Sequence, residues 1–224
     1  MIYTASIACA RQLNIEADVK ELIKGGIKYM HVDFMDGHNV PNLCMNLDTV
    51  KELKESFSDV IIDAHLMVTN PQDYVIRCKG VGVDYMTIDP KTVSNPLVLL
   101  KNIRKNGMKS GIVVNPNDTF SDVKDLLPFV DLLLIMSIIP GIYGREFINN
   151  TYHKIEEFYH YRKINKLDYL ISVDGGINLS NGRKSKEMGA DMVVLGVFAV
   201  FKQNKPISEA CQEFIKAFEA EEKL

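Results

Sequence analysis

Histidine and aspartate residues end three apolar segments of the sequence. These segments end in HVDFMDG (31–37), DAHLM (63–67) and SVDGG (172–176). Because side chains alternate between the two faces of a strand, His31 and Asp33 share one face of the first segment. Polar side chains at the ends of apolar strands are costly to bury unless something compensates. The pattern therefore indicates a functional site at the point where these strands end.

Two imidazoles and two carboxylates in this pattern suit a divalent metal ion. His31, Asp33, His65 and Asp174 are ligand types that bind Zn, Fe, Mn or Co. A lone histidine on a strand is more often a hydrogen-bonded core residue, and this alternative applies to each histidine taken singly. Four such residues ending three strands favour a metal site. We therefore expect one bound divalent ion, whose identity the sequence leaves open.

Glycines after the last two apolar segments indicate a phosphate site. Gly175 and Gly176 follow one segment, Gly196 and Val197 follow the next, and each pair is predicted to open a helix. Backbone amides at helix N-termini bind phosphate, and barrels often place such a site after strands seven and eight. Tight turns also need glycine, so a Gly-Gly pair alone is weak evidence. Its pairing with Gly196 strengthens the interpretation.

Other residues at strand ends complete the predicted substrate site. Gly141 and Gly144 lie in a loop, PGIYG (140–144), that we expect to close over the ligand. Met35, Met67 and Met136 also reach strand ends. Soft core packing explains these methionines as well as a dry lining around an anionic intermediate does, and the sequence does not separate the two interpretations.

Short apolar runs alternate with longer amphipathic stretches, as parallel buried strands and covering helices require. Candidate strands lie at 2–9, 28–35, 59–67, 83–89, 108–114, 130–136, 168–174 and 191–196. Candidate helices lie at 15–25, 46–56, 71–80, 95–106, 120–127, 147–165, 179–188 and 206–222. Eight such units exceed the five or six strands usual in a doubly wound sheet. The pattern predicts an α/β protein with one (β/α)8 TIM barrel domain over residues 1–224.

Composition limits the classes of partner. The chain has 224 residues, of which 46% are hydrophobic and 25% charged, and its formal net charge is −3. No basic field is present to recruit nucleic acid or an anionic membrane. The four cysteines are far apart in the sequence, and the first residues lack the pattern of a signal peptide. We expect a cytoplasmic protein that binds a small molecule, with a homo-oligomer left open.

Several motifs together resemble the ribulose-phosphate 3-epimerase family. They are HVDFMDG, VPN (40–42), DAHLM, NP (115–116), IMSIIPG (135–141) and SVDGG, in this order. The resemblance extends from Ser6 to about Phe201. It implies a barrel of the ribulose-phosphate-binding type and an isomerase that epimerises C3 of a phosphorylated ketose through a metal-stabilised enediolate.

The resemblance also assigns roles to residues. It implies that His31, Asp33, His65 and Asp174 bind the metal, and that Asp33 and Asp174 are the acid/base pair on opposite faces of the substrate. The residues expected to contact substrate are Ser6, Met35, His65, Met67, Met136, Gly141, Gly144, Asp174, Gly175, Gly176, Gly196 and Val197.

The sequence leaves the substrate open within this family. Cys9 and the segment VTNPQDY (68–74) look closer to the allulose-6-phosphate 3-epimerase branch. The candidates are D-ribulose 5-phosphate/D-xylulose 5-phosphate and D-allulose 6-phosphate/D-fructose 6-phosphate. The chain departs from the family pattern at five positions. Asp89 stands where the family usually has His, Val197 where it has Ser, and Arg11 where it has Asp. Ile139 and Tyr143 stand where it has Asn and Gly, respectively.

Two other functions remain as alternatives. The phosphate-binding barrel lyases, which are decarboxylases and aldolases, resemble this chain in their phosphate loops but carry Asp-x-Lys-x-x-Asp on strand three. The corresponding segment here, DAHLMV (63–68), has no lysine. A non-catalytic sugar-phosphate sensor is suggested by Asp89 and Val197, but it does not require all four predicted ligands.

Overall fold

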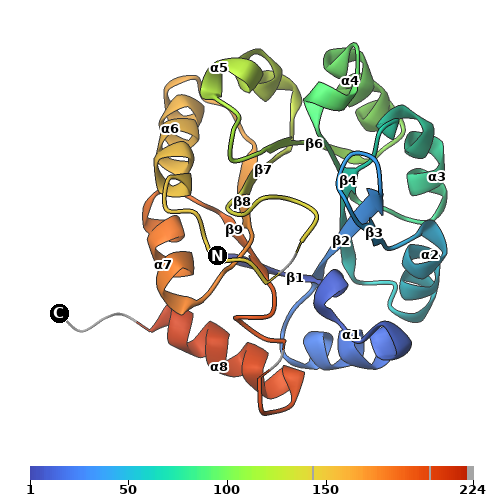
Figure 1. Ribbon diagram of the computed structural model, residues 1–224, viewed down its shortest axis with the longest axis vertical. Helices are drawn as coiled ribbons and strands as arrows, with labels where there is room; N and C mark the ends of the chain where they lie inside the picture. The colour runs from blue at the N-terminus through green and yellow to red at the C-terminus, as the bar shows by residue number, and fades with distance from the viewer. Residues whose placement is uncertain (143, 202, 221–224) are drawn as a thin grey trace.

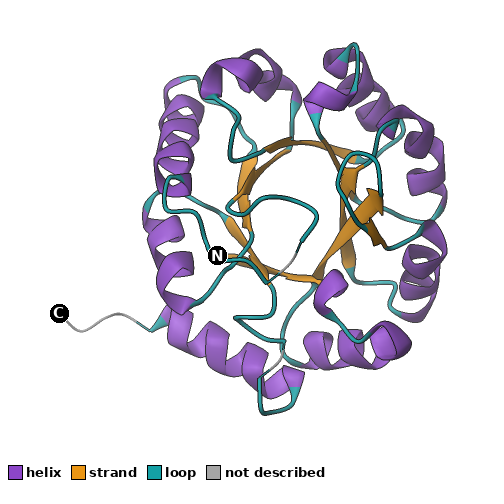
Figure 2. Ribbon diagram, in the orientation of Figure 1, coloured by secondary structure: helices purple, strands orange, loops and turns teal. Residues whose placement is uncertain are grey.

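The structure is a computed structural model, and it describes residues 1–142, 144–201 and 203–220. The described chain forms a closed barrel of parallel strands with helices around its outside (Figures 1 and 2). The predicted (β/α)8 TIM barrel is therefore confirmed. Among the described residues, no helix combines the length and apolar character needed to cross a membrane.

Eight short strands make the barrel, and the pairing of β1 with both β2 and β9 closes it. The barrel strands are β1 (Ile2–Ser6), β2 (Tyr29–Asp36), β4 (Ile61–Met67), β5 (Tyr85–Ile88), β6 (Lys109–Val114), β7 (Leu132–Met136), β8 (Leu170–Asp174) and β9 (Met192–Leu195). All of their pairings with one another are parallel.

The helices cover the outer face of the barrel. They are α1 (Ile15–Lys24), α2 (Leu47–Ser56), α3 (Val75–Gly80), α4 (Pro96–Lys105), α5 (Phe120–Val123), α6 (Thr151–Ile164), α7 (Leu179–Glu187) and α8 (Ile207–Glu219). Outward-facing strand residues such as Val32, Ile62 and Ala64 are fully buried in the main hydrophobic core. Burying these apolar side chains between strands and helices is the main contribution to the stability of such a fold.

Strand register places the predicted site residues beside one another. His31 on β2 lies opposite Asp63 on β4, and Asp33 lies opposite His65. Met136 on β7 lies opposite Asp174 on β8. Because side chains of one parity point to one face of a strand, the four predicted ligands on β2, β4 and β8 all face the barrel interior.

Several predicted boundaries were wrong. The first strand ends at Ser6, and a 3-10 helix follows at Ile7–Cys9. The segments 71–74 and 124–129 are 3-10 helices rather than α-helix, and α6 starts at Thr151 rather than at residue 147. Residues 221–222, predicted to end the last helix, lie outside the described residues. Short 3-10 turns share the apolar spacing of helix ends, so periodicity does not distinguish them.

The sequence did not predict β3 (Leu43–Cys44), a two-residue strand antiparallel to β2. It belongs to the excursion between β2 and α2, which reaches the β7–α6 loop. There Asn42 Nδ2 donates a hydrogen bond to the Gly141 carbonyl at 3.0 Å. Two residues carry no detectable alternation pattern, so only tertiary contacts reveal this strand.

Candidate active site

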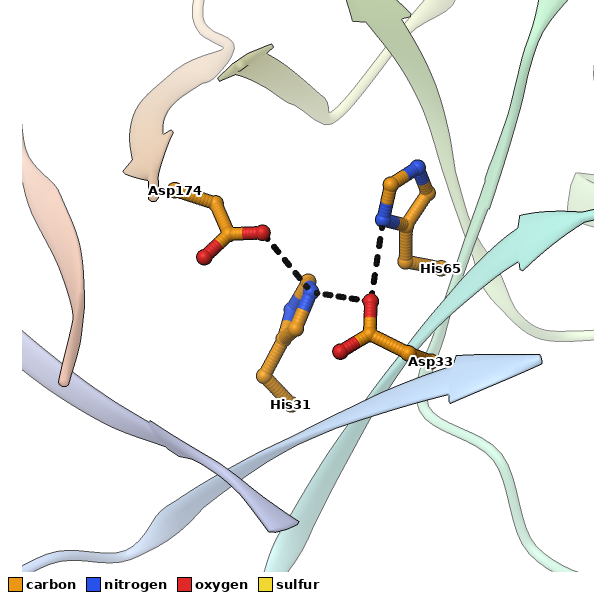
Figure 3. A group of neighbouring side chains, drawn as sticks. All are labelled: His31, Asp33, His65 and Asp174. Carbon is orange, nitrogen blue, oxygen red and sulfur yellow. Dashed lines mark hydrogen bonds and ion pairs between the residues drawn. The ribbon is translucent and has the colours of Figure 1, made fainter. Parts of the chain in front are cut away.

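The four predicted ligands meet at the carboxyl ends of β2, β4 and β8 (Figure 3). Each offers one ligand atom, and these atoms all lie within 4.8 Å of one another. His31 Nε2 is 3.2 Å from Asp33 Oδ1 and 3.7 Å from Asp174 Oδ2. His65 Nδ1 is 3.2 Å from the same Asp33 oxygen. Residues from distant parts of the sequence thus form one compact cluster.

This cluster has the donor set and the burial that a divalent cation requires. His31 Nε2 is buried and makes no hydrogen bond with any described residue. Buried polar atoms normally make well-aligned hydrogen bonds, whereas this nitrogen faces two carboxylates at ion-pair distances of 3.2 and 3.7 Å, as ligands around a shared cation do. Two imidazoles and two carboxylates suit the transition metals that bind both nitrogen and oxygen. The residues therefore fit the predicted metal ion.

Burial and neighbouring charges shift the pKa values of the two carboxylates of the cluster in opposite directions. Burial alone would raise the pKa of Asp33, but His31 and His65 outweigh it and hold this pKa well below its usual range. Burial raises the pKa of Asp174 to about 6, a rise that His31 opposes and Asp33 increases. Pairs of carboxylates whose environments drive their pKa values apart are typical of acid–base sites.

The carboxylates of the cluster favour the protonated form of His31. Burial alone would lower the pKa of this imidazole, but the carboxylates of Asp33 and Asp63 more than offset it and raise the pKa well above its usual value. Three acidic side chains, Asp33, Asp63 and Asp174, thus lie around one buried imidazole. Such an arrangement favours a cation at its centre, either a proton or a metal ion.

Asp63 belongs to the cluster, although the sequence analysis gave it no role. Its Oδ2 lies 2.8 Å from His31 Nδ1, and its side chain is fully buried. A signal was available in the motif DAHLM, because Asp63 lies two residues before His65 and so shares its face of β4. The partner of Asp63 is set by strand register, which places it opposite His31.

A pocket opens above the cluster, between the loops that follow the strands. Of the predicted substrate-binding residues, its lining includes Ser6, Met35, Met67, Met136, Gly141, Gly144, Asp174, Gly175, Gly176, Gly196 and Val197. His65 does not line it, since this side chain is only 1% exposed. Asp33 does line it, and Ser6 Oγ donates a hydrogen bond to Asp33 Oδ2 at 3.1 Å.

Apolar residues of the pocket were missed in the sequence. They include Ala8, Ile138, Pro140, Ile142, Ile177, Val194 and Phe198, and Cys9 lines the pocket as well. Ile138, Pro140 and Ile142 come from the β7–α6 loop, which crosses the barrel mouth in Figure 2. Apolar loop residues carry no sequence signal that distinguishes a pocket lining from ordinary packing.

Two glycines after β8 allow the backbone to pack closely against the β7–α6 loop. Gly175 has φ of 115°, and a Cβ there would lie 2.6 Å from Ile138. Gly176 has φ of 62°, and a Cβ there would lie 2.8 Å from backbone atoms of Arg145 and Phe147. Only glycine fits such positions without strain. Asn178 then caps α7, accepting a hydrogen bond from the Asn181 amide.

The prediction that Gly196 opens a helix was wrong. Residues 197–201 form successive turns, in which the amides of Ala199, Val200 and Phe201 all donate to the Gly196 carbonyl. The next helix, α8, begins only at Ile207. Turns and a first helical turn share the same start signal after a strand, so the sequence alone does not separate them.

The departures from the family pattern lie mostly away from the cluster. Asp89 does not line the pocket; it accepts hydrogen bonds from the Lys91 amide at 2.8 Å and from Asn115 Nδ2 at 3.0 Å. Arg11 forms an ion pair with Asp18. Ile139 is 71% exposed, and Tyr143 lies outside the described residues. Among the departures that the structure describes, Val197 is the one that lines the pocket.

Comparisons with known proteins show the family of the chain. The model of the ribulose-phosphate 3 epimerase family matches residues 2–201. The ribulose-phosphate 3-epimerase of Mycobacterium tuberculosis is 35% identical over 181 residues, covering 81% of this chain and 78% of that protein. The Bacillus subtilis protein of the same name is 31% identical over 195 residues, covering 86% of this chain and 89% of its own length.

A solved structure supports the fold alone. A mutant tryptophan synthase alpha-subunit from Pyrococcus furiosus has a TM-score of 0.70 and 13% identity, and the match covers 97% of this chain and 96% of that one. At such low sequence identity a shared fold does not imply a shared function. The family match and the curated relatives carry more: the chain belongs to the ribulose-phosphate 3-epimerase family and is an enzyme of the isomerase class.

Proposed function

We propose that the protein inverts C3 of a phosphorylated ketose, with Asp33 and Asp174 as the proton acceptor and donor. One observation carries this proposal. Carboxylates from β2 and β8 line the same pocket and both lie within 4 Å of His31 Nε2, at 3.2 Å and 3.7 Å. Inversion needs two such groups, because the proton leaves from one face of C3 and returns to the other.

His31, Asp33, His65 and Asp174 would hold one divalent metal ion, for which Zn, Fe, Mn and Co are candidates. When bound, such an ion supplies a Lewis acid for the negative charge that develops on the substrate oxygens. The protein side chains carry out the proton transfers. One aspartate takes the C3 proton, and the other gives a proton to the opposite face.

The phosphate of the substrate is proposed to bind the backbone amides around Gly175, Gly176, Gly196 and Val197. Gly175 and Gly176 line the pocket and have no side chains to stand between their amides and a ligand. Fixing the phosphate holds C3 between the two carboxylates, and this positioning lowers the entropic part of the barrier. Met35, Met67 and Met136 line the pocket and limit the access of water to the reacting carbon.

A Val197→Ser variant is expected to bind inorganic phosphate more tightly. Val197 lines the pocket beside Gly196, so a hydroxyl there adds one donor at the proposed phosphate site. One added hydrogen bond is worth about 1 kcal/mol, or about a fivefold lower Kd. Isothermal titration with phosphate measures this, with Val197→Thr as a bulkier hydroxyl control. Unchanged or weaker binding in both variants would place the phosphate elsewhere.

The substrate is either a pentulose 5-phosphate or a hexulose 6-phosphate. The curated relatives are named ribulose-phosphate 3-epimerases, which favours D-ribulose 5-phosphate. Turnover of D-ribulose 5-phosphate and D-allulose 6-phosphate, measured side by side on metal-loaded protein, tests the proposed function. A kcat/KM that is much higher for one sugar identifies the substrate. Failure to epimerise either sugar would contradict the proposal.

A further inference from the structure

A carboxylate lies behind one of the proposed metal ligands, on the side away from the cluster centre. Asp63 on β4 is fully buried, and its Oδ2 is 2.8 Å from His31 Nδ1. The other ring nitrogen of His31, Nε2, points toward Asp33 and Asp174 (Figure 3). One imidazole therefore connects Asp63 to the centre of the site.

Asp63 differs from the buried carboxylates that serve the fold. Asp18 accepts hydrogen bonds from the amide, Nε and Nη2 of Arg11. Asp118 accepts from the Asn115 amide and from the ammonium group of Lys91. Asp63 has His31 as its hydrogen-bond partner, and its Oδ1 has none among the described residues. Burying a carboxylate with so few hydrogen bonds costs free energy. Local packing does not offset that cost, so we look for a role of Asp63 in the site.

The direction of the hydrogen bond between Asp63 and His31 shows what this role is. An ionised carboxylate only accepts hydrogen bonds, so the proton between Asp63 and His31 resides on Nδ1. The lone pair of the neutral ring is then on Nε2, the atom that faces Asp33 and Asp174. Histidines that ligate metals commonly have their second nitrogen held in this way by a carboxylate or carbonyl.

We propose that Asp63 is a positioning residue for the metal centre: it holds His31 in the Nδ1–H tautomer and so presents Nε2 to a divalent cation. This inference rests on the proposed function, because it needs the metal centre. Asp63 also adds negative charge beside Asp33 and Asp174 without taking a coordination position. Both effects raise the affinity of the centre for a divalent ion.

Cobalt binding tests this role separately from catalysis. Metal-free wild type and an Asp63→Asn variant are titrated with Co²⁺, followed by the visible absorption of the bound ion. Loss of a carboxylate partner of this kind typically weakens metal affinity by about 10- to 100-fold, and we expect this rise in Kd for Asp63→Asn. A carboxylate that only stabilised the fold would lower the unfolding temperature and leave this Kd unchanged.

Ser172 offers a matched control. It lies two residues before the proposed ligand Asp174, just as Asp63 lies two residues before His65, and it is fully buried. Its hydroxyl makes no hydrogen bond to any described residue, so it supports none of the ligands. Ser172→Ala is therefore expected to bind Co²⁺ like wild type. An equal loss of affinity in both variants would show general damage to the barrel core and overturn the proposal.

The outcomes separate this inference from the proposed function. If wild type binds no divalent ion, the metal centre itself is wrong. If wild type and Asp63→Asn bind Co²⁺ equally, only the role of Asp63 fails. Should Asp63→Asn not fold, long-range ¹H–¹⁵N spectra of zinc-loaded wild type decide the matter. We expect a protonated Nδ1 and a metal-bound Nε2 on His31, and the reverse assignment would overturn the proposal.

Discussion

Replacing Asp174 with asparagine is expected to lower kcat by about a thousandfold or more, even at saturating metal concentration. Asparagine keeps the shape of the side chain but does not exchange a proton with C3 of the substrate. It also removes one charged ligand from the cluster, so metal affinity is expected to fall as well. Measuring kcat at several Co²⁺ concentrations separates the lost proton transfer from the lost affinity. Near-normal kcat at saturation would remove Asp174 from the mechanism.

Asp89 provides the control for this change. It is another aspartate at the carboxyl end of a barrel strand, directly after β5, but it does not line the pocket. The Lys91 amide donates to its Oδ1 and Asn115 Nδ2 to its Oδ2, so an asparagine oxygen keeps the first of these bonds, and the second requires the Asn115 amide to turn over. Asp89→Asn is therefore expected to retain kcat near the wild-type value. A comparable loss in this variant would indicate a general effect of charge at the barrel mouth.

Removing divalent metal is expected to abolish measurable turnover and to lower the unfolding temperature. Ligand atoms of Asp33 and Asp174 lie within 4.8 Å of each other, so a divalent ion between these carboxylates stabilises the folded cluster. A ligand at about 100 times its Kd stabilises the folded state by about 2.7 kcal/mol. Activity after dialysis against a chelator, and the unfolding temperature of the same samples, measure both effects.

Adding ions back to the metal-free protein tests the donor set. Zn²⁺, Fe²⁺, Mn²⁺ or Co²⁺ is expected to restore activity, because imidazole nitrogen suits these metals. Ca²⁺ prefers a shell of oxygen ligands and is expected to restore far less. Full activity in the chelated protein, with no metal detected by elemental analysis, would contradict a metal centre at His31, Asp33, His65 and Asp174.

Strand parity was sufficient to predict the cluster. His31 and Asp33 alternate with apolar residues on β2, and burying such polar side chains is costly unless something compensates. The barrel followed from the number of alternating units. A closed barrel brings all its strand ends to one mouth, so the proximity of Asp174 to His31 needed no further information.

The sequence could not reveal features that depend on cross-strand register or on loops. Asp63 had the right parity, but its partner His31 is 32 positions away and becomes visible only when β2 and β4 are aligned. The short strand β3 and its contact with Gly141 are tertiary features without local periodicity. The turns after Gly196 were predicted as a helix start because a glycine directly after a strand precedes turns and helices alike.

Deuterium labelling of C3 tests most directly whether two carboxylates act on opposite faces of one carbon. Unlabelled substrate is converted in D₂O and the product is analysed after only a few per cent of turnover. Because the donor aspartate exchanges its proton with solvent before it acts, the account predicts product with deuterium at nearly every C3 and remaining substrate with little. Product that keeps its original C3 hydrogen would show return of the same proton by a single group and contradict the two-aspartate mechanism.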